Sequence, residues 1–354
     1  MGAGSSGREQ EQAAQARASR RGRLRALLER RGLGAAVLRK PENFAWYSGG
    51  GNDRVEYVAP EGVADLVVTA DAEYVLASSI EAPRMRDEEA IGFEVVEYPW
   101  HEGPDDALAE LLAGVPFGAD VELPGALELG EELGRLRLRL DADALTRLRR
   151  IGADLSAALA EAAAAVAPGA REHEAAGAIA GACRSRGLVP TVLLAATDER
   201  IRRYRHPLPT DAPIERRCML VASAQRGGLY ANLTRMVQFE EPEPEIARRQ
   251  QACEEILGRM REEATRPGRT LAEAFEDCRR FYAEAGFPDE WRFHHQGGLT
   301  GYASREVIAT PYTDVPLEGE QAFAWNPSIT GAKAEETFIL TDAGPEVVTP
   351  RPTA

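Results

Sequence analysis

The sequence predicts an α/β (α+β) protein in which a small N-terminal α/β domain is followed by a larger C-terminal domain. Its 354 residues exceed what one small hydrophobic core organises, which favours two domains. Up to about residue 140, short apolar runs alternate with helical patterns, as in α/β layer domains. The last third carries short apolar runs broken by proline and glycine, which is typical of antiparallel strands.

The N-terminal domain is expected to span residues 20–140. Residues 1–19 are rich in Gly, Ser, Gln, Ala and Arg, and we expect a disordered tail there. Apolar, β-branched runs predict strands at 35–38, 64–70, 73–77 and 94–98. Helical periodicity predicts helices at 21–31, 79–88 and 105–113, with a turn and a short helix at 41–51.

The C-terminal domain is expected to span residues 141–354. It opens with a long, alanine-rich amphipathic helix over 141–167 that Pro168 and Gly169 terminate. Further helices are predicted at 171–186, 243–265 and 270–285. Strands are predicted at 190–195, 218–223 and 234–239, and antiparallel strands within 307–348.

Bulk properties exclude several classes of function. A net charge of −15 argues against non-specific nucleic-acid binding, which requires a basic face. Neither a membrane-spanning apolar stretch nor the apolar run of a signal peptide is present in the sequence. The four cysteines form no CxxC pair, which favours reduced thiols and no structural zinc. We therefore expect a cytoplasmic protein with a small-molecule substrate and neither nucleic acid nor membrane as a partner.

Several separated motifs carry a family resemblance. They read Tyr-Arg-His-Pro-Leu-Pro-Thr-Asp at 204–211, Gly-Leu-Tyr-Ala-Asn-Leu-Thr-Arg at 228–235, Phe-His-His-Gln-Gly at 293–297 and Ala-Trp-Asn-Pro-Ser-Ile at 324–329. In this order they resemble the pita-bread fold of methionine aminopeptidase, aminopeptidase P, prolidase and creatinase. Segment 41–50 resembles the smaller domain of the creatinase and prolidase branch. The resemblance implies a creatinase-type N-terminal domain followed by a pita-bread domain.

The resemblance also locates a metal site that this sequence has altered. Metal-dependent members hold two ions with two aspartates, a histidine and two glutamates, and the ions generate hydroxide near neutral pH. The resemblance places these positions on Val221, Asn232, His294, Asn326 and Glu335. Only His294 and Glu335 are good ligands, because valine has no oxygen and a neutral amide binds dications weakly. We expect no metal and no other cofactor; the alternative that keeps a metal recruits Glu336 or His295.

Creatinase looks like a metal-free branch of this family. In it a histidine carries protons and carboxylates bind a guanidinium group. The resemblance places that histidine on His206, and Arg305 follows His294 by eleven residues, as in creatinase. Arg305 is then implied to bind a substrate carboxylate with its planar fork. The guanidinium-binding carboxylate positions fall on Asn232 and Asn326, whose amides suit a neutral amide, urea or carbonyl group better.

Further site residues follow from the same resemblance and from proximity in the sequence. We expect His294 and Glu335 to orient His206 or the attacking water, and we name Gln296 and Tyr302 as candidate cavity residues. Creatinase-like proteins form homodimers in which the small domain of one subunit closes the other's site. Arg54, in loop 49–57, is therefore a candidate contact for an anionic group across such a homodimer.

Each of these side chains also has a purely structural interpretation. His206 can cap or satisfy the core, Asn232 and Asn326 can be inert relics, and Arg305 can simply pair with Glu306. Because residues 294 and 295 are adjacent, only one of the two histidines can face a pocket from a strand. We expect His294 to point inward and His295 to pack or to hydrogen-bond the backbone.

The preferred interpretation is a metal-independent, creatinase-like hydrolase, or a related acid–base enzyme acting on C–N bonds, with a small carboxylate-bearing amide or amidine as substrate. Two alternatives stay open. One is an Xaa-Pro peptidase-type metalloenzyme, the activity that fold similarity alone suggests. The other is a catalytically inactive pita-bread protein that binds peptides, as such a domain in a histone chaperone does.

Overall fold

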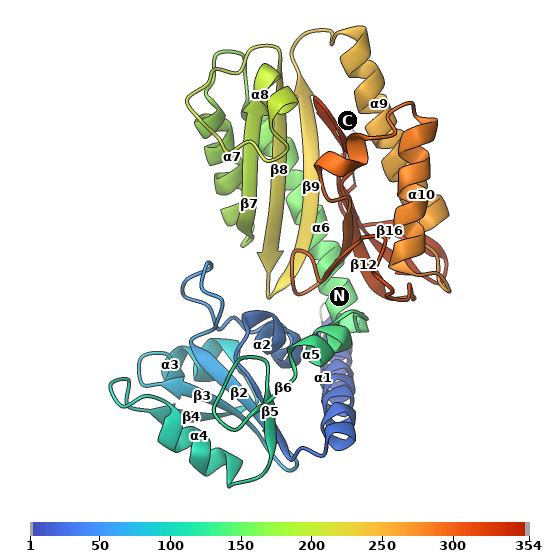
Figure 1. The fold of residues 1–354 in the computed structure, drawn as a ribbon. Coiled ribbons are helices and arrows are strands. Elements are labelled where there is room, and N and C mark those ends of the chain that lie inside the picture. The colour runs from blue at the N-terminus through green and yellow to red at the C-terminus, as the bar shows by residue number, and fades with distance from the viewer. Residues whose placement is uncertain (1–2, 351–354) are drawn as a thin grey trace. The chain divides into compact units, whose positions relative to one another are not determined.

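The computed structural model describes residues 3–350, with side chains from residue 14 onward, and confirms the predicted mixed α/β architecture. The chain forms two compact units, Met1–Ala144 and Leu145–Ala354. Each unit has its own sheets and its own helices (Figure 1). Within residues 3–350 we find no helix with both the length and the apolar character needed to cross a bilayer.

The N-terminal unit contains a six-stranded mixed sheet. Its strand order is β4-β3-β2-β1-β5-β6, with β1 antiparallel to β2 and parallel to β5. The strands are β1 (Ala35–Leu38), β2 (Ala64–Thr69), β3 (Glu73–Ser78), β4 (Glu94–Tyr98), β5 (Phe117–Ala119) and β6 (Leu127–Glu128). The helices are α1 (Ala3–Arg31), α2 (Pro41–Ser48), α3 (Ala82–Arg84) with the π-turn Met85–Glu89, α4 (Asp105–Leu112) and α5 (Gly130–Arg137). Helix α4 buries Leu108 and Leu112 against Val37, Val67 and Leu76 of the sheet.

Helix α1 corrects the predicted disordered tail. We expect disorder over residues 1–19, whereas α1 begins at Ala3. The Arg17 guanidinium pairs with Glu73 at 2.7 Å, and that of Arg20 donates to Asp141 at 2.6 and 2.9 Å. Alanine, glutamine and arginine are good helix formers. These residues therefore continue, toward the N-terminus, a helix that Arg17 and Arg20 anchor to the rest of the unit.

The C-terminal unit contains two antiparallel sheets and a hairpin, which confirms the antiparallel strands expected within 307–348. One sheet has the order β7-β8-β9, the other β11-β10-β12-β15-β16, and β13 pairs with β14. The strands are β7 (Val189–Thr197), β8 (Arg217–Arg226), β9 (Leu229–Gln238), β10 (Gly297–Thr300), β11 (Val307–Ile308), β12 (Gln321–Trp325), β13 (Ser328–Ile329), β14 (Ala332–Lys333), β15 (Glu336–Thr341) and β16 (Gly344–Val347).

Helices flank these sheets (Figure 1). They are α6 (Ala142–Ala165), α7 (Glu172–Arg184), α8 (Asp198–Arg203), α9 (Pro244–Arg259) with the π-turn Met260–Ala264, α10 (Leu271–Glu284) and the 3₁₀ turn Glu290–Phe293. The two sheets are joined where β9 meets β15: the Asn232 N–H donates to Thr337 Oγ1 at 2.8 Å, and that hydroxyl donates back to the Asn232 carbonyl at 3.0 Å. This junction fixes the β9 side chains relative to the strands that carry the rest of the site.

Gly297 sets the path of β10 next to the two adjacent histidines. Its φ is +102°, a backbone conformation that residues other than glycine rarely adopt. A Cβ atom there would lie 2.0 Å from the Ala324 carbonyl oxygen of β12. Glycine at this position lets β10 lie against β12 and so places His294 and His295 beside the cavity.

Candidate active site

The C-terminal unit encloses a cavity of about 460 Å³. Its lining comes from strands β7, β8 and β9, from the loop after α8, and from loops and strand β14 in the second half of the unit. Its lining residues are Thr191, Val192, Leu193, Leu194, His206, Leu208, Val221, Ala222, Ser223, Asn232, His295, Ser304, Arg305, Asn326, Lys333 and Glu335. The structure thus brings together five of the residues that the sequence singled out: His206, Asn232, Asn326, Arg305 and Glu335.

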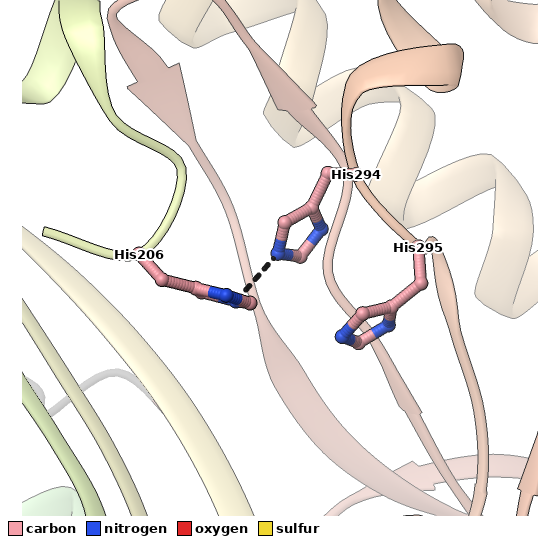
Figure 2. A group of neighbouring side chains, drawn as sticks. All are labelled: His206, His294 and His295. Atoms are coloured by element: carbon pink, nitrogen blue, oxygen red, sulfur yellow. Dashed lines mark hydrogen bonds between the residues drawn. The ribbon is translucent and has the colours of Figure 1, made fainter.

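Three imidazoles lie close together, two of them in the cavity wall (Figure 2). His206 lies in the loop after α8, and His294 and His295 follow the 3₁₀ turn Glu290–Phe293. The Nε2 atoms of His206 and His294 are 2.9 Å apart, so one ring donates a hydrogen bond to the other. His294 is buried and makes this contact from behind His206, which itself lines the cavity.

All three imidazoles are held in their neutral form. Burial and the positive charge of Lys333 lower the pKa of His294 to about 2. Burial and the charge of Arg305 lower the pKa of His295 to about 4. Partial burial and Lys333 also lower the pKa of His206, although part of this side chain is exposed. A neutral imidazole can accept a proton near pH 7.

Glu335 is a carboxylate fully committed to the protein. Oε1 accepts from Arg305 Nη2 at 2.9 Å, and Oε2 accepts from Thr234 Oγ1 at 2.8 Å and pairs with Lys333 Nζ at 3.2 Å. Burial alone would raise the pKa of Glu335, but the two cations and the Thr234 hydroxyl lower it to about 2. Glu335 therefore remains ionised and anchors two cations, so it is poorly suited to orient His206 or to act as a base.

Arg305 is also more constrained than its predicted role requires. One end of its fork donates to the Ser304 carbonyl at 2.7 Å and the other to Glu335 at 2.9 Å. Glu335, rather than the neighbouring Glu306, is its ion-pair partner. The Nε–H is buried and has no partner in the described part of the chain. Bidentate binding of a substrate carboxylate through Nε and Nη2 of Arg305 would compete with the existing contact to Glu335.

The two asparagines differ in what they offer a ligand. The Asn232 amide donates to Thr300 Oγ1 at 3.3 Å and accepts from Ser304 Oγ at 3.2 Å, so the protein already satisfies it. Asn326 is 2% exposed, and its Oδ1 atom has no hydrogen-bond partner among residues 3–350. A buried acceptor without a donor carries a free-energy cost that a ligand N–H can relieve.

Two predicted contacts do not line the cavity, and a third belongs to the other unit. Gln296 is buried and accepts from the Tyr282 hydroxyl at 2.7 Å, while the hydroxyl of the buried Tyr302 accepts from Arg147 at 2.9 Å. Neither lines the cavity, so their expected role as cavity residues is wrong. Arg54 belongs to the N-terminal unit, where it donates to the Ala59 carbonyl at 3.2 Å. Its contact with substrate across a homodimer stays a prediction.

The structure reverses the expected roles of the two adjacent histidines and adds lining residues that the motifs do not indicate, Ser304 and Lys333 among them. His295 lines the cavity with its Nδ1 atom buried and unpartnered among the described residues, whereas His294 turns to His206. Ser304 and Lys333 lie in the cavity wall but were not expected there. One signal for Lys333 exists in the sequence, because it and Lys40 are the only two lysines of the chain.

The residues at the implied metal positions do not fit a metal pair. Val221 offers only an aliphatic side chain, and Asn232 and Asn326 offer neutral amides. Both oxygens of Glu335 already contact cationic side chains. A dication placed there would have to displace Lys333 and Arg305 and would find too few anionic ligands to replace them.

The three imidazoles alone are a poor alternative site for an ion. Each ring offers one nitrogen, and these atoms lie within 4.8 Å of one another. The rings of His294 and His295 are stacked, however, with 4.5 Å between centroids and 23° between planes. Ring lone pairs lie in the ring plane, so those of two stacked rings run side by side instead of converging. The charges of Lys333 and Arg305 further disfavour a dication here.

Comparisons with known proteins agree with this architecture. Residues 146–342 match the model of metallopeptidase family M24, and residues 20–149 match the creatinase/prolidase N-terminal domain. A prolidase structure from Pyrococcus horikoshii OT3 is similar, with a TM-score of 0.79 and 16% identity over 94% of this chain and 98% of that chain. An X-Pro aminopeptidase from Thermotoga maritima MSB8 gives 0.77 and 20% over 94% and 98%.

The same fold also occurs in a protein of a different kind. The N-terminal domain of the FACT complex subunit SPT16 from chickpea (Cicer arietinum) matches with a TM-score of 0.72 and 12% identity, over 95% of this chain and 97% of that chain. The comparison with curated protein sequences gives no match. Identities this low show a shared fold, whereas the reaction that the chain catalyses depends on its cavity residues.

Proposed function

The chain belongs to metallopeptidase family M24, and we propose that it is a hydrolase that cleaves a C–N bond without a bound metal. The observation that carries the proposal is the environment of Glu335, whose two carboxylate oxygens contact Arg305 and Lys333. In the metal-dependent members that this chain resembles, the matching carboxylate neutralises metal ions. Two fixed side-chain cations supply that positive charge here.

The histidine pair supplies the proton transfer. His206 accepts a proton from water as the water oxygen adds to the carbonyl carbon of the substrate, and it returns the proton to the nitrogen as the C–N bond breaks. His294 accepts the Nε2–H of His206 at 2.9 Å and so leaves the Nδ1 atom of His206 free to take the proton from water. Both rings are neutral near pH 7, which leaves His206 able to act as the base. Lys333 and Arg305 stabilise negative charge that develops in the cavity.

The cavity favours a small substrate with a neutral polar head and a negative group. A volume of about 460 Å³ is in the range of small-molecule sites. The amides of Asn232 and Asn326 carry no charge to balance a guanidinium group, so a neutral amide or urea suits them better than creatine. Arg305 and Lys333 together outweigh Glu335, which favours a substrate carboxylate.

An activity assay tests this proposal. The full chain, dialysed against EDTA, is incubated with N-carbamoyl and N-acyl amino acids and, for comparison, with an Xaa-Pro dipeptide. We expect hydrolysis of an amide of the first group at a rate that neither EDTA nor added manganese or cobalt changes. His206→Asn should abolish that rate. Loss of activity in EDTA that manganese or cobalt restores would refute the proposal.

Two other functions each have an observation in their favour. The similarity to prolidase and X-Pro aminopeptidase structures favours an Xaa-Pro peptidase, and metal-dependent cleavage of the dipeptide in the same assay would establish it. The similarity to the SPT16 domain favours a peptide-binding protein without catalysis. In that case no substrate of the panel would be cleaved, and peptides would stabilise the chain against heat more than small amides do.

A further inference from the structure

Lys333 is the least expected charge in the cavity. It ends strand β14, is 5% exposed and lines the cavity wall. The chain has 42 basic residues, of which only Lys40 and Lys333 are lysines. Lysine thus stands at a buried position in a chain that otherwise uses arginine almost throughout. An ammonium is a compact point charge with three donors, and it can approach a ligand oxygen from several directions.

The cavity wall carries one more positive charge than negative charge. Its lysine, arginine and carboxylate side chains are Lys333, Arg305 and Glu335, two cations and one anion. The surplus of one positive charge stands out in a chain whose net charge is −15. Burying a charge without a partner is costly, so the arrangement is complete only when a ligand brings one negative charge.

Lys333 and Arg305 differ in how firmly the protein already holds them. Arg305 donates from both ends of its planar fork, to Ser304 and to Glu335, and these two contacts fix its orientation. The ammonium of Lys333 has Glu335 as its single partner within residues 3–350, at 3.2 Å, and so retains two N–H groups. Charge-assisted hydrogen bonds from such donors to a carboxylate are among the stronger ones in proteins.

On the basis of the proposed function, we propose that Lys333 binds the carboxylate of the substrate, while the unpartnered oxygen of Asn326 accepts an N–H from its neutral head. Arg305 is then a positioning residue that holds Glu335, and through it Lys333. The ligand class that satisfies both groups is an amino acid whose nitrogen carries a carbamoyl or acyl group. It has one negative charge for the ammonium and an N–H for the buried acceptor.

Three small molecules separate the parts of this proposal. Hydantoate (N-carbamoylglycine) has the neutral urea head and the carboxylate, methylurea has the head alone, and creatine has the carboxylate with a cationic head. Binding of each to the full chain is measured by calorimetry. We expect hydantoate to bind at least about tenfold more tightly than either of the others. Lys333→Met should remove that advantage and leave methylurea binding unchanged, whereas the matched control Lys40→Met should bind like the wild-type chain.

The small number of lysines allows a test without any substitution in the protein studied. Labelling with [¹³Cε]lysine gives two side-chain NMR signals, and Lys40→Met alone assigns both of them. Hydantoate should shift the Lys333 signal of the wild-type chain and leave that of Lys40 in place. This readout holds even if Lys333→Met fails to fold.

The inference fails if the wild-type chain binds none of the carboxylate probes, if Lys333→Met binds hydantoate as tightly as the wild type, or if the Lys333 signal does not move. These outcomes are separate from those of the proposed function. Metal-dependent turnover together with loss of hydantoate binding in Lys333→Met would refute the metal-free mechanism alone. Metal-free turnover with unchanged binding in that variant would refute only the role of Lys333.

Discussion

Replacing Glu335 by glutamine should destabilise the C-terminal unit far more than the loss of an ordinary ion pair. The side chain is 4% exposed, and those of Lys333 and Arg305 are 5% and 13% exposed. At about 3 Å and an effective dielectric constant of about 20, each pair contributes a gross attraction of about 5 kcal/mol, much of it offset by desolvation. Glu335→Gln leaves two buried cations without their shared anion, and we expect a loss of about 3–5 kcal/mol of unfolding free energy.

The assay is equilibrium unfolding of the full chain in urea, which does not screen charges. A matched control is Glu346→Gln, because Glu346 makes a two-point ion pair with Arg149 at 2.7 and 2.8 Å but is 42% exposed. We expect that control to lose less than about 1 kcal/mol. Adding Lys333→Met to Glu335→Gln should recover about half of the loss, since one of the two stranded charges disappears. Equal effects of the two glutamine variants, or simple additivity in the double variant, would show that the two buried cations do not depend on Glu335.

Three further predictions concern pH and backbone. Burial and the charge of Lys333 hold the pKa of His206 below 6.5, so its NMR titration and the acidic limb of the kcat/KM profile should lie below that pH. Lys333→Met should move the titration midpoint of His206 upward. An unchanged midpoint would show that Lys333 does not act on this ring. Burial raises the pKa of Asp53 from 3.8 to about 8, so the folded chain retains a proton that the unfolded chain loses. Between these values the unfolding free energy should fall with rising pH by up to about 1.4 kcal/mol per unit, and Asp53→Asn should flatten that slope in urea unfolding at pH 5 and 8; equal slopes would count against it. Gly297→Ala should lower the free energy of unfolding by about 1–3 kcal/mol or more and weaken hydantoate binding. The reason is that a φ of +102° and a Cβ position 2.0 Å from the Ala324 carbonyl oxygen leave no room for a methyl group. A variant as stable as the wild type in a thermal melt would contradict this.

Local patterns predicted most of the fold. Strands β1 and β4 begin and end where their apolar, β-branched runs do, because both are bounded by turn-forming or polar segments. The start of α1 was missed, since a polar helix anchored by Arg17 and Arg20 has no apolar periodicity to reveal it. What stabilises its described part is pairing with distant residues, which the local sequence does not show.

The site was predictable only as far as residue positions go. The family motifs predicted that His206, Asn232, Asn326 and Glu335 lie close together, and all four line one cavity. The partners of Glu335 depend on contacts between segments far apart in the chain, and these decide that it anchors cations instead of acting on water. Which of two adjacent histidines faces the cavity depends likewise on the backbone before β10.

If Lys333 and Arg305 take the place of metal ions beside Glu335, the chain should not bind a metal tightly. This is measured by elemental analysis of the full chain after dialysis against manganese or zinc and removal of free ions by gel filtration. We expect no stoichiometric metal, both in the wild-type chain and in His294→Gln. One or two ions per wild-type chain that His294→Gln or Glu335→Gln removes would contradict this expectation.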